Sequence, residues 1–214
     1  MKEKTLKNLE SLPFFTKSAL MVIEEIGPKA LYENIRRWVQ KGLLIRLKNG
    51  LYVTKTCVDR SLHDERYLEL VANKLVIPSY VSLEYVLQKH GLLTEATFAV
   101  TSVTTKSTRR YTNKLGIFTY STLNHGLYFG FKRQSYGKNT IYEAELFKAL
   151  FDYFYLRQGA LSPEKGETIG EMRINWSNLG KREFRNFCKT VEKKGTGKMV
   201  KMIPLLEEAY GYAD

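Results

Sequence analysis

The stretch FTKSALMVIEEIGPKALYENIRRWVQKGLLIRLKNGLYVT, residues 15–54, decides the fold of the N-terminal part of this chain. Thr16 is placed to cap a helix over residues 17–25, because its hydroxyl oxygen can accept a free amide of the first turn. A proline is favoured at the first position of a helix and a glycine just after its end. The pattern therefore predicts a second helix from Pro28 to about Lys41, closed by Gly42.

Two short apolar runs follow this helix pair, residues 43–47 and 51–53. They are separated by Lys48-Asn49-Gly50, and Asn-Gly between such runs is a strong hairpin signal. Two helices followed by a hairpin are typical of a winged helix-turn-helix, with the hairpin as the wing. The leucines of the preceding segment, residues 5–12, predict a further helix packed under this unit.

The second helix has two distinct faces at about 100° per residue. One face is apolar and predicts core positions at Leu31, Ile35, Trp38 and Val39. The opposite face carries groups that can reach base edges and phosphates in a major groove. That face comprises Lys29, Glu33, Arg36, Arg37 and Gln40, with Tyr32 at its boundary.

The sequence thus predicts a DNA-reading surface formed by the two helices and the wing. The alternative is an ordinary solvated basic face, but here the helix-turn-helix spacing and a cationic wing accompany the basic residues. The predicted DNA-binding residues are Lys17, Ser18, Lys29, Tyr32, Glu33, Arg36, Arg37, Gln40, Arg46, Lys48 and Asn49.

The composition of the 214-residue chain is that of a globular protein with a basic balance. Its formal net charge is +12 and its pI is near 9.5, which favours an anionic partner. The two cysteines, Cys57 and Cys188, are far apart, and the three histidines are not at metal-ligand spacings. We therefore expect no metal, no cofactor and a reducing cytoplasmic location, with no membrane partner.

The expected fold class is α+β, with the winged helix-turn-helix over residues 1–56 and a helical domain with a small antiparallel sheet over residues 57–214. A polar connection at residues 55–60 marks the boundary. Period and turn signals predict helices at 61–76, 79–91, 144–156, 180–194 and 199–210, strands at 97–104, 116–122 and 126–131, and loops at 105–114 and 158–170.

No catalytic set stands out, since the chain has no GxSxG motif and no phosphate-binding glycine loop. One enzyme alternative is a metal-dependent nuclease directed by the winged helix, in which Glu143, Glu145, Lys148 and Asp152 hold the metal. The ordinary interpretation of these four residues is charge pairing along the exposed edge of a buried helix.

A second alternative is an RNA-binding module. The run GLYFGFKR at residues 126–133 has some likeness to aromatic strands on which bases stack, although aromatic rings pack into the core by default. The basic loop and the helix near residue 185 are the candidates for a second nucleic-acid or partner surface. Its residues are Lys106, Arg109, Arg110, Lys181, Arg182, Arg185 and Lys189.

Several motifs in order resemble one family. ENIRRWVQKGLLIRLKNGLYV is followed by PSYVSLEYVLQKHGLL, AVTSVTTKSTRRY, GIFTY, KALFDYFYL and RINWSNL. This order is similar to that of the AbiEi-type antitoxins of type IV (abortive-infection) toxin–antitoxin systems, over residues 14–200.

The resemblance implies a bacterial protein that represses its own operon through the winged helix. It also implies a C-terminal domain that counters a co-encoded nucleotidyltransferase-like toxin, by contact with the toxin or through its nucleic-acid target. The roles it transfers by position are groove contacts by Lys29, Tyr32, Glu33, Arg36 and Arg37 and wing contacts by Lys48 and Asn49. No C-terminal residue receives a role from it.

Overall fold

The computed structural model describes residues 3–61, 63–95, 97–159, 170 and 172–211, with only the backbone for residues 3, 4 and 6. The N-terminal unit contains three helices and a three-stranded antiparallel sheet of order β1-β3-β2. Its elements are α1 (Glu3–Glu10), β1 (Phe15–Thr16), α2 (Lys17–Glu24), α3 (Pro28–Gln40), β2 (Leu44–Lys48) and β3 (Leu51–Thr54).

The expected local signals form these elements. The Thr16 hydroxyl accepts a hydrogen bond from the Ala19 amide at 3.1 Å and so caps α2. Pro28 begins α3, and Gly42 after its end has a φ of 69°, which a residue with a side chain rarely adopts. The Asn49-Gly50 turn joins β2 and β3. The helices and the hairpin are therefore confirmed, while their designation as a winged helix stays a prediction.

The β2–β3 hairpin is shared between two hydrophobic cores. Alternate residues point to opposite faces of a strand. Leu44 and Tyr52 pack into the N-terminal core with Leu31 and Trp38. Ile45 and Val53, their neighbours in the strands, pack into the larger core of the second unit. The hairpin therefore contributes side chains to both cores. The expected domain boundary at residue 56 follows the hairpin in sequence and does not separate the two cores.

The second unit is built on a six-stranded sheet of order β6-β7-β5-β4-β9-β8. Pairs β5–β7 and β4–β9 are parallel, and the other neighbours are antiparallel. The elements are α4 (Lys55–Arg60), α5 (Glu65–Leu75), β4 (Ser79–Val81), α6 (Glu84–Lys89), β5 (Ala99–Thr104), β6 (Arg109–Asn113), β7 (Gly116–Thr122), η1 (His125–Leu127), β8 (Phe131–Tyr136), β9 (Asn139–Ala144), α7 (Leu146–Arg157), η2 (Trp176–Asn178), α9 (Lys181–Lys194), α10 (Gly197–Lys201) and α11 (Ile203–Gly211).

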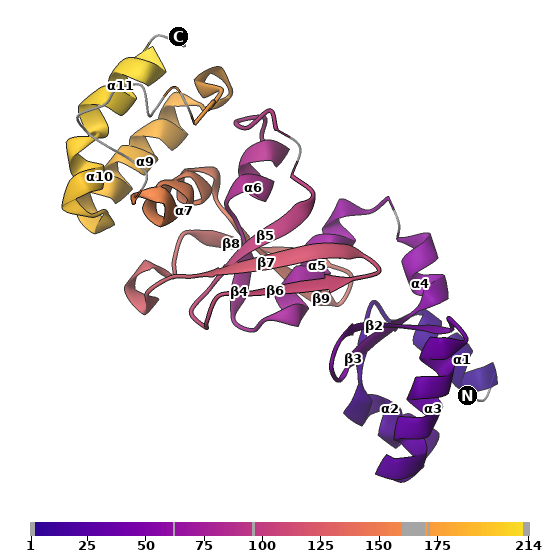
Figure 1. Ribbon diagram of the computed structural model, residues 1–214. Coiled ribbons are helices and arrows are strands. Elements are labelled where there is room, and N and C mark those ends of the chain that lie inside the picture. Colours follow the sequence, from indigo (N-terminus) through magenta and orange to yellow (C-terminus); the bar gives the residue numbers. More distant parts are fainter. Residues whose placement is uncertain (1–2, 62, 96, 160–169, 171, 212–214) are drawn as a thin grey trace.

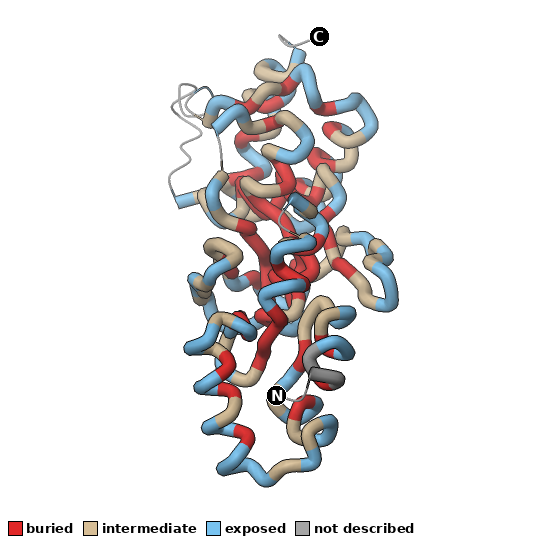
Figure 2. Tube along the Cα trace, turned by 90° about the vertical axis from the view of Figure 1, so that its right-hand side faces the viewer, coloured by how far each residue is buried: buried red, intermediate tan, exposed pale blue. Residues whose placement is uncertain are grey.

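Helices pack against the central strands of this sheet. Helix α5 packs against strands β4, β5 and β9, and α7 packs against α6, α9 and β9. Figure 1 shows α7, α9, α10 and α11 gathered at one end of the molecule and the N-terminal unit at the other. Buried positions concentrate along the sheet between these ends (Figure 2). Within the described residues, no helix is long and apolar enough to cross a membrane.

The α+β class is confirmed, but the expected small antiparallel sheet is wrong. Segment 79–91, expected as one helix, is strand β4 followed by α6, because the central strand pairs with partners distant in sequence, β5 and β9. Segment 105–114, expected as a loop, contains strand β6. A polar sequence suffices there, since β6 lies at the sheet edge and pairs only with β7.

Further boundaries differ for local reasons. Segment 126–131, expected as a strand, begins with η1, and the strand starts only at Phe131. The connection at 55–60 is a helix, since the Thr54 hydroxyl accepts from the Cys57 amide. Helix α5 begins after Asp64, which caps it, rather than at Ser61. The final helix is divided into α10 and α11. Leu62 lies outside the described residues, as does most of the loop expected at 158–170.

Candidate nucleic-acid interface

A groove of about 920 Å³ lies between α3, the β2–β3 hairpin and the turn that joins β6 to β7. We call it the basic groove. It brings together seven of the predicted DNA-binding residues: Lys17, Tyr32, Arg36, Gln40, Arg46, Lys48 and Asn49. The second unit contributes the far wall through Tyr111, Thr112, Asn113 and Lys114.

The charge of the basic groove has one sign. Five of its lining residues are basic: Lys17, Arg36, Arg46, Lys48 and Lys114. None of the described residues that line it is acidic. Low-dielectric walls with charge of one sign concentrate the electrostatic field, so the potential inside the groove is positive.

Two hydrogen bonds between the units hold the walls of the groove in place. The Lys48 ammonium donates to the carbonyl oxygen of Leu75 at 2.7 Å, and the Asn113 amide donates to the carbonyl oxygen of Leu47 at 3.1 Å. Lys48 is half-buried. Its ammonium therefore positions the hairpin in addition to contributing charge, a role that the sequence did not indicate.

The remaining predicted residues lie on the surface beside the groove. Lys29, Glu33 and Arg37 are exposed on α3, and Ser18 is exposed on α2. The Arg37 guanidinium donates to the Asn34 side chain at 3.1 Å. The Lys17 ammonium lies 5.8 Å from the ring centre of Tyr32, which joins the start of α2 to α3. The exposed face of α3 is consequently continuous with one wall of the basic groove.

The far wall was not predicted from the sequence, although the sequence contains a signal for it. Asn113 and Gly116 flank a tight turn between two strands, and the Asn113 side-chain oxygen accepts from the Leu115 amide at 2.8 Å. Asparagine and glycine at such positions predict a hairpin. Its position opposite α3, however, depends on the packing of the two units.

The two parts of the predicted second surface do not meet. Lys106, Arg109 and Arg110 lie in and before β6, at the edge of the central sheet, while α9 lies with α10 and α11 at one end of the molecule (Figure 1). The Arg109 guanidinium is held locally, since it donates to the Ser107 carbonyl at 3.0 Å and to the Ser107 hydroxyl at 2.6 Å. The α9 residues Lys181, Arg182, Arg185 and Lys189 are all exposed.

The residues of the nuclease alternative are not arranged as a metal site. Glu143 and Asp152 are buried in different ion pairs, Glu143 with Lys89 and Asp152 with Lys148. The interpretation of Lys148 and Asp152 as an exposed charge pair is also wrong, because both side chains are fully buried. Among the described residues, no group of three or more histidines, cysteines, aspartates or glutamates could hold a metal ion.

The aromatic run of the RNA alternative packs inward. The rings of Tyr128 and Phe131 lie 5.1 and 4.7 Å from the ring of Tyr80, which is fully buried. Gly130, with a φ of 71°, allows the chain to pass close to the side chain of Lys148. Tyr128, Phe129 and Phe131 are partly buried and pack against the core.

These features define an α+β protein with a basic groove between its two units. A scan against protein-family models finds no match to the chain. A search of curated proteins also finds no significantly similar sequence.

Proposed function

We propose that the protein is a cytoplasmic, non-enzymatic DNA-binding regulator that represses its own operon and acts as the antitoxin of a type IV toxin–antitoxin pair. The observation that carries the DNA-binding part is the basic groove beside the exposed face of α3. Five cations and no acidic residue line it. The antitoxin part rests on the motif order that resembles the AbiEi-type antitoxins.

In this proposal α3 lies in the major groove, which at about 12 Å wide admits a helix. Arg36, Arg37 and Gln40 are exposed on α3 and can reach base edges. Lys17 and Arg46, from α2 and β2, contact the phosphate backbone on either side. Lys114 does the same from the second unit, since it lines the same groove.

Substitution of the α3 arginines tests base recognition. We expect Arg36→Ala and Arg37→Ala each to weaken binding to DNA from upstream of the gene by about 1–3 kcal/mol where a base contact is lost. The measurement is a fluorescence-anisotropy titration at fixed salt, with a scrambled duplex of equal length beside it. A base contact predicts a larger loss on the upstream duplex than on the scrambled one.

Lys138→Ala is the matched control, since Lys138 is an exposed cation in the turn between β8 and β9. It removes the same charge and should leave affinity for both duplexes nearly unchanged. Equal binding of upstream and scrambled DNA by the unsubstituted protein would exclude the repressor function.

The antitoxin function has a separate test in cells. The adjacent open reading frame is expected to encode a nucleotidyltransferase-like protein that arrests growth when expressed alone, and co-expression of this chain should restore growth. A neighbour that is harmless alone would remove this part of the proposal and leave the DNA-binding part standing.

A further inference from the structure

Helix α9 carries a line of cations along one exposed face. Arg182, Arg185, Lys189 and Lys193 follow one another at intervals of three or four residues, so they lie on the same side of the helix. All four are exposed. At 1.5 Å per residue the line is about 16 Å long. We call it the α9 stripe.

The cations of the α9 stripe are not paired within the described part of the chain. Other surface cations have carboxylate partners, such as Lys55 with Asp59 at 2.6 Å and Arg173 with Glu95 at 3.2 Å. No ion pair joins a stripe residue to a described carboxylate. The four cations repel one another, only partly offset by the exposed Glu192 on the same side of α9, and a line of negative charge would relieve that repulsion.

The chemistry of the α9 stripe fits a phosphate backbone better than a protein. Protein interfaces centre on buried aromatic and apolar residues and are depleted in lysine. The apolar side of α9, with Phe184, Phe187 and Val191, is buried against the rest of the unit, and no large apolar residue of α9 is exposed. Exposed cations alone are enough to bind phosphates. A duplex segment as long as the stripe, about 16 Å, presents roughly five phosphates per strand.

The position of the stripe sets it apart from the basic groove. Helix α9 lies beside α10 and α11 at one end of the molecule, and α3 lies at the other end, with the six-stranded sheet between them (Figure 1). We propose that the α9 stripe binds the phosphate backbone of a second nucleic-acid segment, distinct from the segment held in the basic groove. This surface operates whether or not the groove reads a promoter.

The test uses full-length protein in which the groove is first neutralised by Arg36→Gln, Arg46→Gln and Lys114→Gln. The probe is a labelled 20-base-pair duplex of random sequence, titrated between 50 and 200 mM salt. The groove variant should retain binding. Adding Arg182→Gln, Arg185→Gln, Lys189→Gln and Lys193→Gln should weaken that binding at least about tenfold at low salt and reduce the salt slope by about 3.6, since each of four phosphate contacts contributes about 0.9.

A second set of substitutions controls for net charge. Lys55→Gln, Lys132→Gln, Arg133→Gln and Lys138→Gln also remove four exposed cations and should leave the salt slope of the groove variant unchanged. Glutamine is a good helix former, so α9 should stay folded, which circular dichroism checks. An equal loss in both sets, or no loss in the stripe set, overturns the proposal. Polyglutamate serves as a second probe. If the stripe substitutions weaken binding to polyglutamate but not to the duplex, the proposal is overturned in favour of an acidic protein partner.

Discussion

A Lys148→Met protein is expected to be less stable than the unsubstituted chain by about 3–5 kcal/mol, the usual cost of breaking a buried ion pair from one side. Lys148 and Asp152 lie one turn apart on α7, and neither side chain is exposed. The other carboxylate oxygen of Asp152 accepts from the hydroxyls of Tyr80 and Ser82, each at 2.9 Å. Methionine would leave this carboxylate buried without a cation.

The surroundings explain why the pair is sensitive. The Lys148 ammonium lies 4.8 Å from the ring centre of Phe129 and 5.0 Å from that of Phe151. Burial lowers the pKa of Lys148 although Asp152 opposes this shift. Burial likewise raises the pKa of Asp152, against the effect of Lys148. Each partner therefore depends on the other to remain charged.

Urea unfolding at pH 7, followed by circular dichroism, measures the loss. The control is the double variant Lys148→Met with Asp152→Asn, in which the amide keeps hydrogen bonds to Tyr80 and Ser82 without a buried charge. It should recover most of the lost stability. A single variant within about 1 kcal/mol of the unsubstituted protein would show that the pair is not held in its charged form.

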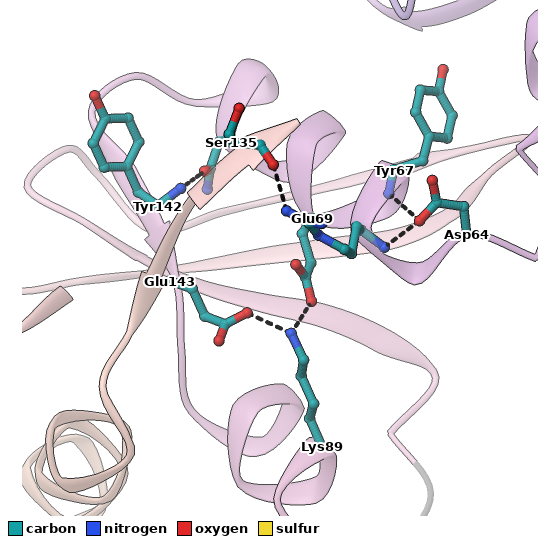
Figure 3. A network of polar contacts seen from close by, with 9 residues as sticks. Asp64, Tyr67, Glu69, Lys89, Ser135, Tyr142 and Glu143 are labelled. Carbon is teal, nitrogen blue, oxygen red and sulfur yellow. Dashed lines mark hydrogen bonds and ion pairs between the residues drawn. The ribbon is translucent and has the colours of Figure 1, made fainter. Parts of the chain in front are cut away.

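Lys89→Met is expected to cost about 2–4 kcal/mol at pH 7, less than Lys148→Met because the Lys89 side chain is 30% exposed and water can reach the site. Figure 3 shows the Lys89 ammonium between Glu69 and Glu143, at 2.7 and 2.6 Å. Both glutamates are buried, so methionine would leave two carboxylates facing each other. The cost should shrink towards pH 5 as one of them takes up a proton.

The raised pKa of Glu69 predicts the direction in which the free energy of unfolding changes with pH. Burial raises the pKa of Glu69, only partly offset by Lys89, and Glu143 raises it further. The folded chain therefore binds this proton more tightly than the unfolded chain. The resulting stability is complete below about pH 4.5, the ordinary pKa of the group, and is lost as pH rises through the folded-state pKa.

Glu69→Gln removes this dependence while Glu143 still pairs with Lys89. The free energy of unfolding of Glu69→Gln, relative to the unsubstituted protein, should increase between pH 4.5 and pH 7. The experiment is a series of urea titrations across that range. If the free energy of unfolding of Glu69→Gln relative to the unsubstituted protein stays constant or falls as pH rises, the pKa of Glu69 is not raised in the folded protein.

Most of the N-terminal unit could be predicted from the sequence because its signals act within a few residues. The Thr16 cap, the proline at the start of α3 and the Asn49-Gly50 turn each determine the backbone next to them. The cationic face of α3 also follows from helical spacing alone. For the same reason the long apolar helix α7 and the amphipathic helix α9 were correctly predicted.

The topology of the large sheet could not be predicted where distant segments pair. Ser79–Val81 is a strand because Val81 pairs with Ser102 on one side and Glu143 on the other. The polar segment that contains Arg110 is a strand because Phe118 and its neighbours in β7 provide a partner. The pairings of β4 join residues far apart in the sequence, and no local pattern records them. Strands β6 and β7 form a hairpin instead, and β6 was missed because its polar residues show no strand pattern.

The local elements and the half of the groove that α3 and the hairpin provide follow from the sequence, because they depend on neighbouring residues. The basic balance follows from composition alone. Only the tertiary structure placed Asn113 against Leu47, 66 positions away, and so supplied the second wall. It alone also placed Lys148 and Asp152 in the core. An i,i+4 charge pair looks the same in sequence whether water or aromatic rings surround it, and the packing of distant residues makes that difference.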